Sequence, residues 1–300
     1  MKQVLIVGAG RLAATLLADL AAAGSPALWW ARPSPRRDAV QQWLARQSLP
    51  SPPRFAELSE LVDLPIDVLV LAVTDRQVGA VAQQLADAGL RAAVALHCAG
   101  ALAVEPLRVG LSPACGSCHP LAAVADPLLA QARQSPLRHA LFAVDGDEEA
   151  QLAAHELSAL LGGFSAQVQG PQRAAYHAAA ALIANDWVAL ADAALRTVVQ
   201  AGLAEPLLRQ GLLHLAGTAL QALQAVPADQ ALLRGLTGAV ARGDGATLQR
   251  HLETIDDSQV RELHRLASLV LAKRCAQEGQ LSPQVADQLA AALQDPARDL

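Results

Sequence analysis

The chain begins with Met1-Lys2-Gln3-Val4-Leu5-Ile6-Val7-Gly8-Ala9-Gly10-Arg11-Leu12-Ala13, a short apolar strand that runs straight into a glycine turn. In this G-x-G-x-x-A pattern Gly8 allows a tight turn, Gly10 lets the backbone approach a pyrophosphate, and Ala13 lets the next helix pack closely on the strand. The free N–H groups of the helix expected over about 11–23 would point at the phosphates. The pattern predicts a dinucleotide site that includes Gly8, Gly10, Arg11, Leu12 and Ala13.

The end of the second expected strand, residues 27–32, indicates which dinucleotide is bound. Chains that prefer the unphosphorylated cofactor usually place Asp or Glu there, about 20 residues after the glycines. Arg32 occupies this position, and no carboxylate lies between Asp19 and Asp38. Guanidinium groups pair with phosphate and a serine hydroxyl can donate to it, which favours NADP(H) over NAD(H). The alternative is a basic loop that only faces solvent. The residues expected to hold the 2′-phosphate are Arg32, Ser34, Arg36 and Arg37.

Composition narrows the class of protein. A length of 300 residues allows two domains. The net charge of −5 and the aromatic share of 3% argue against a nucleic-acid partner, which would need a basic face with stacking side chains. No apolar leader precedes the first strand, and the longest uncharged stretch, residues 210–228, lacks the continuous apolarity of a membrane span. We therefore expect a cytoplasmic protein without a membrane partner.

Cys115-Gly116-Ser117-Cys118-His119 matches a pattern that attaches haem, and its C-x-x-C part also suits zinc or a redox disulfide. Haem attachment would need export, and a structural zinc site would need a second ligand pair. We expect no metal here, and interpret these cysteines chiefly as small apolar residues of a buried strand, with a regulatory disulfide left open.

Strands and helices alternate over the first half of the chain. The apolar runs 66–73 and 92–97 are typical of buried parallel strands, and shorter strands are expected at 116–119, 141–144 and 164–168. Ligands of such sheets bind outside the carboxyl ends of the strands, so we expect Val73, Thr74 and His97 beside the ribose and nicotinamide.

After Gly170-Pro171 the apolar pattern becomes helical. Helices are expected at about 171–202, 205–225, 229–236, 246–254, 257–278 and 283–294. The fold class predicted is α/β, with a Rossmann-type parallel-sheet domain that binds NADP(H) over residues 1–169 and an all-α domain for substrate binding and dimerisation over residues 170–300.

Five motifs give the chain a resemblance to a family. They are Gly8 to Ala13, His97-Cys98-Ala99-Gly100, Gly116 to Pro120, Tyr176-His177 with Asn185, and Leu236 to Asp244 with His251. They resemble Rossmann-like proteins whose C-terminal half is a domain of unknown function, a group similar to pyrroline-5-carboxylate reductase, ketopantoate reductase and 6-phosphogluconate dehydrogenase. The resemblance implies an NADP-dependent oxidoreductase architecture whose helical domain often forms homodimers.

The dehydrogenases of this resemblance carry a lysine four residues before the asparagine of the catalytic helix. Ala181 stands at that position, so their general acid is missing. His177 is the first substitute because imidazole titrates near neutral pH, and His119 is the second. Asn185 would orient a substrate oxygen. In a regular helix it lies about 80° from His177 and about 12 Å along the axis. Tyr176 is expected to pack in the core.

The glycine-rich segment from Thr237 to Asp244 interrupts the helices. Arg242 could clamp a substrate carboxylate, and Thr237 is predicted to bind substrate beside it. Asp244 is expected to cap the helix that follows.

Two functions of different class remain. The first is an NADPH-dependent reductase of a small carbonyl or imine substrate, for which a 2-keto acid is one candidate. The second is a nonenzymatic NADP(H)-binding sensor or scaffold, which the alanine at position 181 favours.

Overall fold

The computed structural model describes residues 2–129 and 134–294. The chain divides into two compact units, Met1–Ala184 and Asn185–Leu300. The boundary predicted after residue 169 lies at the start of a long helix, whereas the division by compactness falls inside that helix.

The first unit is built on an eight-stranded sheet in the order β3-β2-β1-β4-β5-β6-β7-β8. All neighbouring strands are parallel except β6 and β7, which are antiparallel. The strands are β1 (Val4–Val7), β2 (Ala27–Trp30), β3 (Arg54–Phe55), β4 (Ile66–Leu71), β5 (Ala92–His97), β6 (Ala114–Pro120), β7 (Leu141–Gly146) and β8 (Phe164–Gln167). From β1 the chain adds β2 and β3 on one side and then continues with β4 on the other side of β1. This change of side places a binding crevice at the carboxyl ends of these strands.

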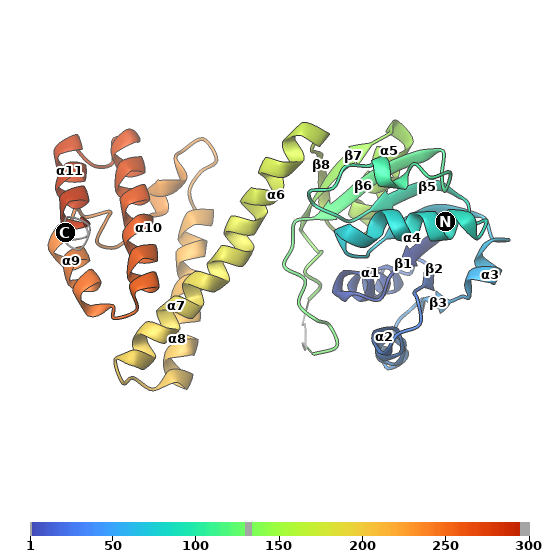
Figure 1. The fold of residues 1–300 in the computed structure, drawn as a ribbon, viewed down its shortest axis with the longest axis horizontal. Helices are drawn as coiled ribbons and strands as arrows, with labels where there is room; N and C mark the ends of the chain where they lie inside the picture. Colours follow the sequence, from blue (N-terminus) through green and yellow to red (C-terminus); the bar gives the residue numbers. More distant parts are fainter. Residues whose placement is uncertain (1, 130–133, 295–300) are drawn as a thin grey trace. The chain divides into compact units, whose positions relative to one another are not determined.

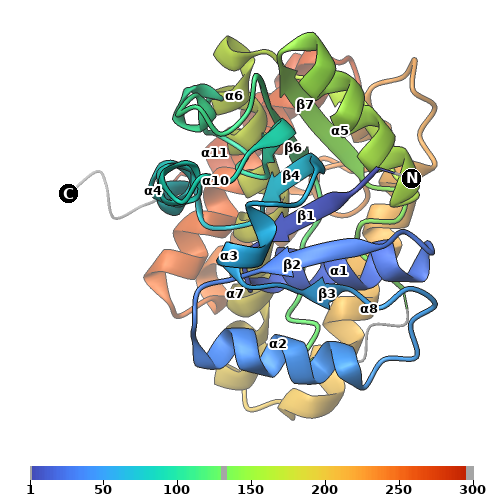
Figure 2. The same cartoon turned by 90° about the vertical axis from the view of Figure 1, so that its right-hand side faces the viewer.

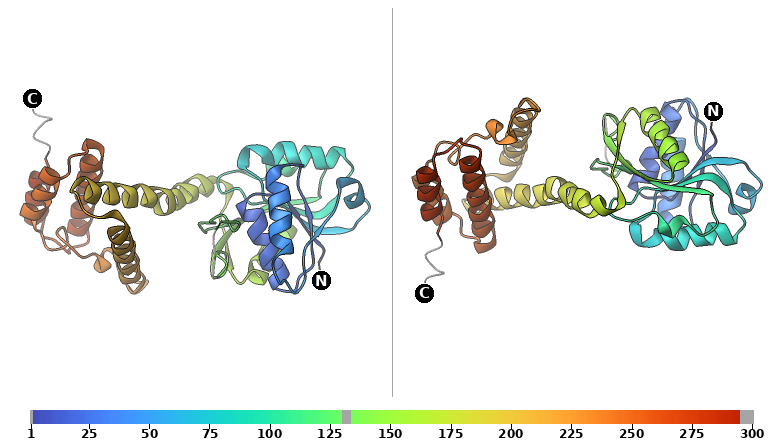
Figure 3. Two further views of the ribbon diagram at one scale, coloured as in Figure 1. Left: turned by 90° about the horizontal axis from the view of Figure 1, so that it is seen from below. Right: turned by 90° about the horizontal axis from the view of Figure 1, so that it is seen from above.

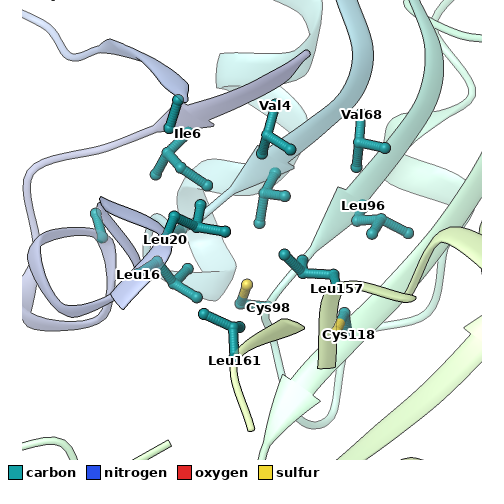
Figure 4. Packing of buried hydrophobic residues seen from close by; sticks show 14 of the residues in the cluster. Val4, Ile6, Leu16, Leu20, Val68, Leu96, Cys98, Cys118, Leu157 and Leu161 are labelled. Carbon is teal, nitrogen blue, oxygen red and sulfur yellow. The ribbon is translucent and has the colours of Figure 1, made fainter. Parts of the chain in front are cut away.

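Helices cover both faces of the sheet (Figures 1 and 2). Side chains on one face pack with α1 (Arg11–Ala22), α2 (Pro35–Ala45) and α5 (Glu148–Leu160). Side chains on the other face pack with α3 (Leu58–Leu61), α4 (Asp75–Asp87) and the 3₁₀ turn η1 (Glu105–Leu107). Figure 4 shows the first of these clusters, in which Val4 and Ile6 of β1 lie near Leu16 and Leu20 of α1. The α/β class predicted from the sequence is confirmed.

Three elements of this unit were not predicted: β3, α3 and α2. In α2 only Val40 and Leu44 are buried, so the apolar pattern is too sparse to indicate a helix. The stretch that carries the residues expected to hold the 2′-phosphate is not a loop throughout, because this helix begins within it, with Ser34 as its N-cap and Pro35 as its first residue. This places the helix N-terminus beside the end of β2.

The predicted helix 171–202 forms one uninterrupted helical run, which Figure 3 shows as a continuous ribbon. After the 3₁₀ turn η2 (Gly170–Gln172) it comprises α6 (Arg173–Ala181), a π-helical turn η3 (Leu182–Asp186) and α7 (Trp187–Gln200). The π-helical turn has a wider winding than the α-helix. The angle expected between His177 and Asn185 from 3.6 residues per turn therefore does not hold.

The second unit continues with α8 (Glu205–Gln224), the 3₁₀ turn η4 (Leu232–Gly235), α9 (Gly245–Thr254), α10 (Ser258–Gln277) and α11 (Pro283–Ala292). The helix predicted at 229–236 is wrong, because only the short turn η4 forms there. Pro227 precedes that stretch and Gly235 ends it, and both residue types disfavour a longer helix. A small core of α9, α10 and α11 includes Leu248, Cys275 and Leu289.

Helices α7 and α8 pack against each other and leave many apolar side chains exposed. Val188, Leu213 and Leu215 are each more than half exposed. A groove of about 430 Å³ between these helices is lined by Trp187, Val188, Leu212 and Leu213, among other mostly apolar residues. By length and composition alone the run Gly170–Gln200 could also cross a membrane.

Candidate cofactor and catalytic site

A cavity of about 640 Å³ lies at the carboxyl ends of β1, β2 and β4. Nine predicted residues line it: Gly8, Gly10, Arg11, Leu12, Arg32, Ser34, Arg36, Val73 and Thr74. Sequence reasoning missed others, including Trp30 at the end of β2, Gln77 in the first turn of α4, and Cys98 directly after β5. Trp30 and Cys98 lie at or directly after a strand end, and Gln77 lies in the first turn of the helix that follows β4. These positions are the signal that could have indicated them.

The two glycines of the turn have different roles in the structure. Gly8 has φ +131°, and a Cβ there would lie 2.5 Å from the carbonyl oxygen of Ala72. Gly10 has φ −70°, and the nearest atom to an added Cβ, the same carbonyl oxygen, is 3.9 Å away. The fold therefore requires glycine at position 8, whereas at position 10 glycine keeps free space in the cavity. Ala13 does not line the cavity but is fully buried under the turn, which is the close helix packing predicted for it.

Trp29 and Trp30 of β2 hold the turn in place. The Gly8 N–H donates to the Trp30 carbonyl oxygen at 2.9 Å. The Trp29 indole N–H donates to the Gly8 carbonyl oxygen at 2.7 Å. Both backbone groups of Gly8 are thus satisfied by β2, which fixes the turn that leads into α1.

The N-terminus of α2 supplies a second cluster of donors beside the cavity. The Ser34 hydroxyl oxygen accepts the Arg37 N–H at 3.1 Å, which leaves its own O–H free to donate. The exposed Arg32 side chain makes no hydrogen bond or ion pair with any described residue. The positive end of the helix dipole reinforces this cluster. Arg32, Ser34 and the helix end together suit an anion.

The other two arginines are engaged elsewhere. The Arg36 guanidinium donates two hydrogen bonds to the Asp126 carboxylate, at 2.8 and 2.7 Å, and a third to the Ala9 carbonyl oxygen at 3.2 Å. The Arg36 side chain therefore lies beside the glycine turn, and its guanidinium is already paired with Asp126. Arg37 pairs with Asp38 at 2.9 Å and stacks over the Phe55 ring, so it does not line the cavity.

His97 is fully buried at the end of β5 and does not line the cavity. Its Nδ1 accepts the Ala99 N–H at 3.2 Å, and its Nε2 lies 3.1 Å from the Ala103 carbonyl oxygen. A carbonyl oxygen only accepts, so the ring proton is on Nε2. Burial is the main reason that the pKa of His97 is lowered to about 4. His97 therefore holds the loop after β5 as a neutral imidazole.

A second polar cluster lies where β6 and the start of α6 meet. His119 Nδ1 and the Tyr176 hydroxyl are 2.9 Å apart, and the rings of His119 and His177 are 5.9 Å apart. A Cβ on Gly100 would collide with His177 and touch His119, so glycine lets both rings approach the loop after β5. His119, Tyr176 and His177 are thus brought together, and sequence reasoning had placed Tyr176 in the core.

Arg173 is the charged residue of this cluster and was not predicted. Its side chain is 1% exposed. Its guanidinium donates to Ser117 Oγ at 2.6 Å and to the Ala99 carbonyl oxygen at 2.7 Å, and its Nε has no partner. No carboxylate within the described ranges lies at ion-pair distance from it. Burial, with the electrostatic effect of the nearby His177 and Arg173 side chains, lowers the pKa of His119 to about 4.

The remaining predicted site residues belong to the second unit. Asn185 is exposed in the π-helical turn, and Thr237 and Arg242 are exposed in the segment before α9. Asp244 caps α9 as predicted, because its carboxylate accepts the Thr247 N–H at 3.0 Å.

All four cysteines are buried and free. Cys115 and Cys118 pack on opposite faces of the sheet, as residues three apart on a strand must. They cannot form a disulfide with each other in this strand, which agrees with their interpretation as apolar residues. Burial raises the pKa of the Cys98 thiol to about 12, so the thiol beside the cavity stays protonated.

The comparisons with known proteins agree with this architecture. Residues 140–270 match the family model described as a domain of unknown function, DUF2520. A search of curated proteins by sequence finds no match.

Several solved structures are similar to the chain over nearly its whole length. A Bacteroides fragilis protein provisionally assigned as an NADP oxidoreductase is 17% identical, with a TM-score of 0.71 over 91% of this chain and 98% of its own. The Thermotoga maritima protein TM1727 is 22% identical, with a TM-score of 0.64 over 92% and 99%. The NADP-bound pyrroline carboxylate reductase of Plasmodium falciparum is 12% identical, with a TM-score of 0.54 over 98% of both chains.

At these identities the likeness is one of fold. It confirms the resemblance inferred from the motifs, because the neighbours include NADP oxidoreductases and a pyrroline carboxylate reductase. The chain has the Rossmann-like fold of these oxidoreductases and carries a DUF2520 match over residues 140–270.

Proposed function

We propose that the protein is an NADP(H)-dependent oxidoreductase that transfers hydride between nicotinamide and a small carbonyl or imine substrate, with 2-keto acids as first candidates. The observation that carries this proposal is the cavity at the carboxyl ends of β1, β2 and β4, which joins a glycine turn to a cationic helix N-terminus. The Plasmodium falciparum neighbour was solved with NADP bound, which supports the same class of cofactor here.

The residues present fit this cofactor. The free space at Gly10 and the N-terminus of α1 would take the pyrophosphate. Arg32, the Ser34 hydroxyl and the N-terminus of α2 would take the 2′-phosphate. Arg36 would join them on leaving Asp126. Val73 and Thr74, at the end of β4, would line the path of the ribose.

When bound, the nicotinamide would supply or accept the hydride. The protein must then position the substrate and provide a proton. His177 and His119 are the proton donors expected from the sequence. The pKa of His119 is lowered to about 4, so its ring is neutral at neutral pH and is better suited to orient another group than to supply the proton. Asn185, Thr237 and Arg242 remain the residues proposed to bind the substrate.

A second candidate function is a nonenzymatic NADP(H) sensor or scaffold. The observation that favours it is Ala181, which leaves α6 without the lysine that the related dehydrogenases use. Such a protein would bind NADPH but would not oxidise it with any substrate.

Steady-state oxidation of NADPH tests the choice between these functions. The first substrate panel contains small 2-keto acids and cyclic imines of the ketopantoate and pyrroline types. The reductase proposal expects at least one to be reduced, with His177→Ala and Asn185→Ala lowering the activity. If both variants retain all activity and ligand affinity, the roles of these residues are wrong, and tight NADPH binding without turnover favours the sensor.

We further propose that a second copy of the chain covers the apolar surface of α7 and α8. The exposed side chains there are mainly Leu and Val, which suit an interface with another apolar helix pair. The homodimer expected from the resemblance would bury these exposed apolar side chains.

A further inference from the structure

Tyr176 is the single acidic hydroxyl in the cluster around His119, and the proposed function does not use it. It lies three residues after Arg173 on α6, so both side chains occupy one face of the helix. The phenol is half-buried, and its oxygen lies 2.9 Å from His119 Nδ1. It is therefore held in one position while part of the ring stays accessible.

The cluster lies at the edge of the sheet where the cofactor cavity opens. Strand β6 runs parallel to β5, and Ser117 pairs with His97 at the carboxyl end of β5. His119 is two residues further in the same direction. Strand β6 is three strands from β1, about 14 Å at 4.8 Å per strand. A dinucleotide that starts at the glycine turn and extends along these strand ends would direct its reactive ring toward His119 and Tyr176.

The charges of the cluster favour an anion at the Tyr176 oxygen. Arg173 is a buried cation with no carboxylate at ion-pair distance among the described residues, although Asp145 and Asp75 act on its charge from further away, and its Nε lacks any acceptor. A buried cation that is not neutralised by a direct ion pair lowers the free energy of an anion formed nearby. Burial raises the pKa of Tyr176, so the phenol is protonated at neutral pH. The charge of Arg173 acts in the opposite direction, because it stabilises the phenolate when this forms.

We propose that the Tyr176 hydroxyl is the proton donor of the reduction, with His119 as a positioning residue that donates its Nδ1–H to the phenol oxygen. This inference rests on the proposed function, which supplies NADPH as the reductant. Hydride adds to the substrate carbon, the electron pair of the C=O or C=N bond takes the proton from Tyr176, and a phenolate remains. The phenolate accepts the His119 Nδ1–H and is later reprotonated by water.

The orientation of the hydrogen bond decides the proposal. If His119 carries its proton on Nδ1, the Tyr176 oxygen is the acceptor and its O–H is free for substrate. If the proton is on Nε2, Nδ1 is the acceptor and the Tyr176 hydrogen is committed to His119. The tautomer of the neutral His119 ring therefore decides whether Tyr176 can donate its proton to a substrate.

Nitrogen NMR of the full-length protein at neutral pH measures this tautomer without any substrate. The His119 signals are assigned as those lost in His119→Gln. We expect a neutral ring protonated on Nδ1. Because Tyr176 is the only tyrosine in the chain, its ring signal can also be titrated directly. His119→Phe, which keeps the ring buried but has no N–H, should raise the pKa of Tyr176, and His119→Gln, which keeps a donor, should raise it less.

A proton on Nε2, or a Tyr176 pKa that falls in His119→Phe, would overturn the proposal whether or not a substrate has been found. With a substrate from the panel, Tyr176→Phe should lower kcat about 100-fold or more, the usual size of general-acid catalysis, and leave NADPH affinity unchanged. Full activity of Tyr176→Phe overturns the proposal. A panel with no turnover counts against the proposed function alone, and the tautomer still decides the state of Tyr176.

Discussion

At the scale of single residues, the glycine turn separates what the fold requires from what the ligand requires. Gly8 has a left-handed backbone and no room for a Cβ, because the Ala72 carbonyl oxygen is too close. Gly10 has an ordinary backbone and open space beside it. The two positions of one motif therefore respond differently to the same substitution.

Gly8→Ala should lower the free energy of unfolding by about 2 kcal/mol or more, since it combines backbone strain with a clash. Gly10→Ala should leave stability nearly unchanged and remove most of the thermal stabilisation by NADPH, since its methyl group fills the space of the pyrophosphate. Urea unfolding with and without NADPH measures both effects. Equal losses of stability in the two variants would contradict this separation.

His97 gives the chain a defined response to acid. Its pKa is 6.5 in the unfolded chain and about 4 in the folded protein, so the folded state takes up its proton later as the pH falls. The stability of the folded state should be unaffected by this group above about pH 6.5, fall between about pH 6.5 and 4, and level off below. The loss from His97 is about 3 kcal/mol. His119 acts in the same direction, by a smaller amount because it is partly exposed.

His97→Gln keeps a donor for the Ala103 carbonyl oxygen and removes the titration. Urea unfolding between pH 7 and pH 4 should therefore show a shallower loss of stability in this variant than in the wild type. His214→Asn is the control, because His214 is exposed on α8. An unchanged slope in His97→Gln would show that His97 does not carry the acid response.

At the scale of elements, α2 connects the sheet to the cofactor cavity through its N-terminus. Its cap residue Ser34 and the neighbouring Arg32 face the cavity, while Arg36 ties the helix to Asp126 in the segment after β6. A phosphate bound at this helix end would meet the Asp126 carboxylate as a like charge. The ion pair therefore competes with the ligand for Arg36.

Asp126→Asn should raise NADPH affinity about fivefold, the size expected for a partly exposed ion pair, and change NADH affinity much less. Isothermal titration calorimetry at constant ionic strength measures both. Asp38→Asn is the matched control, because Asp38 pairs with Arg37, which does not line the cavity. A loss of NADPH affinity in Asp126→Asn would instead show that Asp126 holds Arg36 in its binding position.

The elements also show which parts of the fold can be predicted from local sequence patterns. The strands β1, β4 and β5 are predictable because they are nearly continuous apolar runs. Helix α2 is not, because two buried side chains in eleven residues give no clear period. Arg173 and Tyr176 escaped prediction because their contacts with Ser117, Ala99 and His119 join residues more than 50 positions apart, which no local pattern encodes.

At the scale of the whole molecule, the two units differ in how completely they bury their apolar side chains. The first unit has a closed core on both faces of its sheet and an open cavity at one edge. The second unit has a small core and a large apolar surface on α7 and α8. The cofactor site is thus attributable to the first unit, and the proposed dimer contact to the second.

Light scattering should give twice the mass of one 31.2 kDa chain. Leu213→Lys, in the groove of α7 and α8, should shift the protein to monomer because it buries a charge in the interface. Leu152→Lys is the control, since Leu152 is similarly exposed but belongs to α5 of the first unit. A wild-type monomer at micromolar concentration, or a dimer that survives Leu213→Lys, would rule out this contact.

The central claim is that the cavity of the first unit is an NADP(H) site whose preference comes from the N-terminus of α2. Calorimetric titration of the wild type with NADPH and NADH tests it most directly, repeated on Arg32→Ala and on Arg46→Ala as a control of equal charge. We predict tighter binding of NADPH, an NADPH affinity about 10-fold or more lower in Arg32→Ala, and little change in Arg46→Ala. Equal or tighter binding of NADH to the wild type would contradict the account.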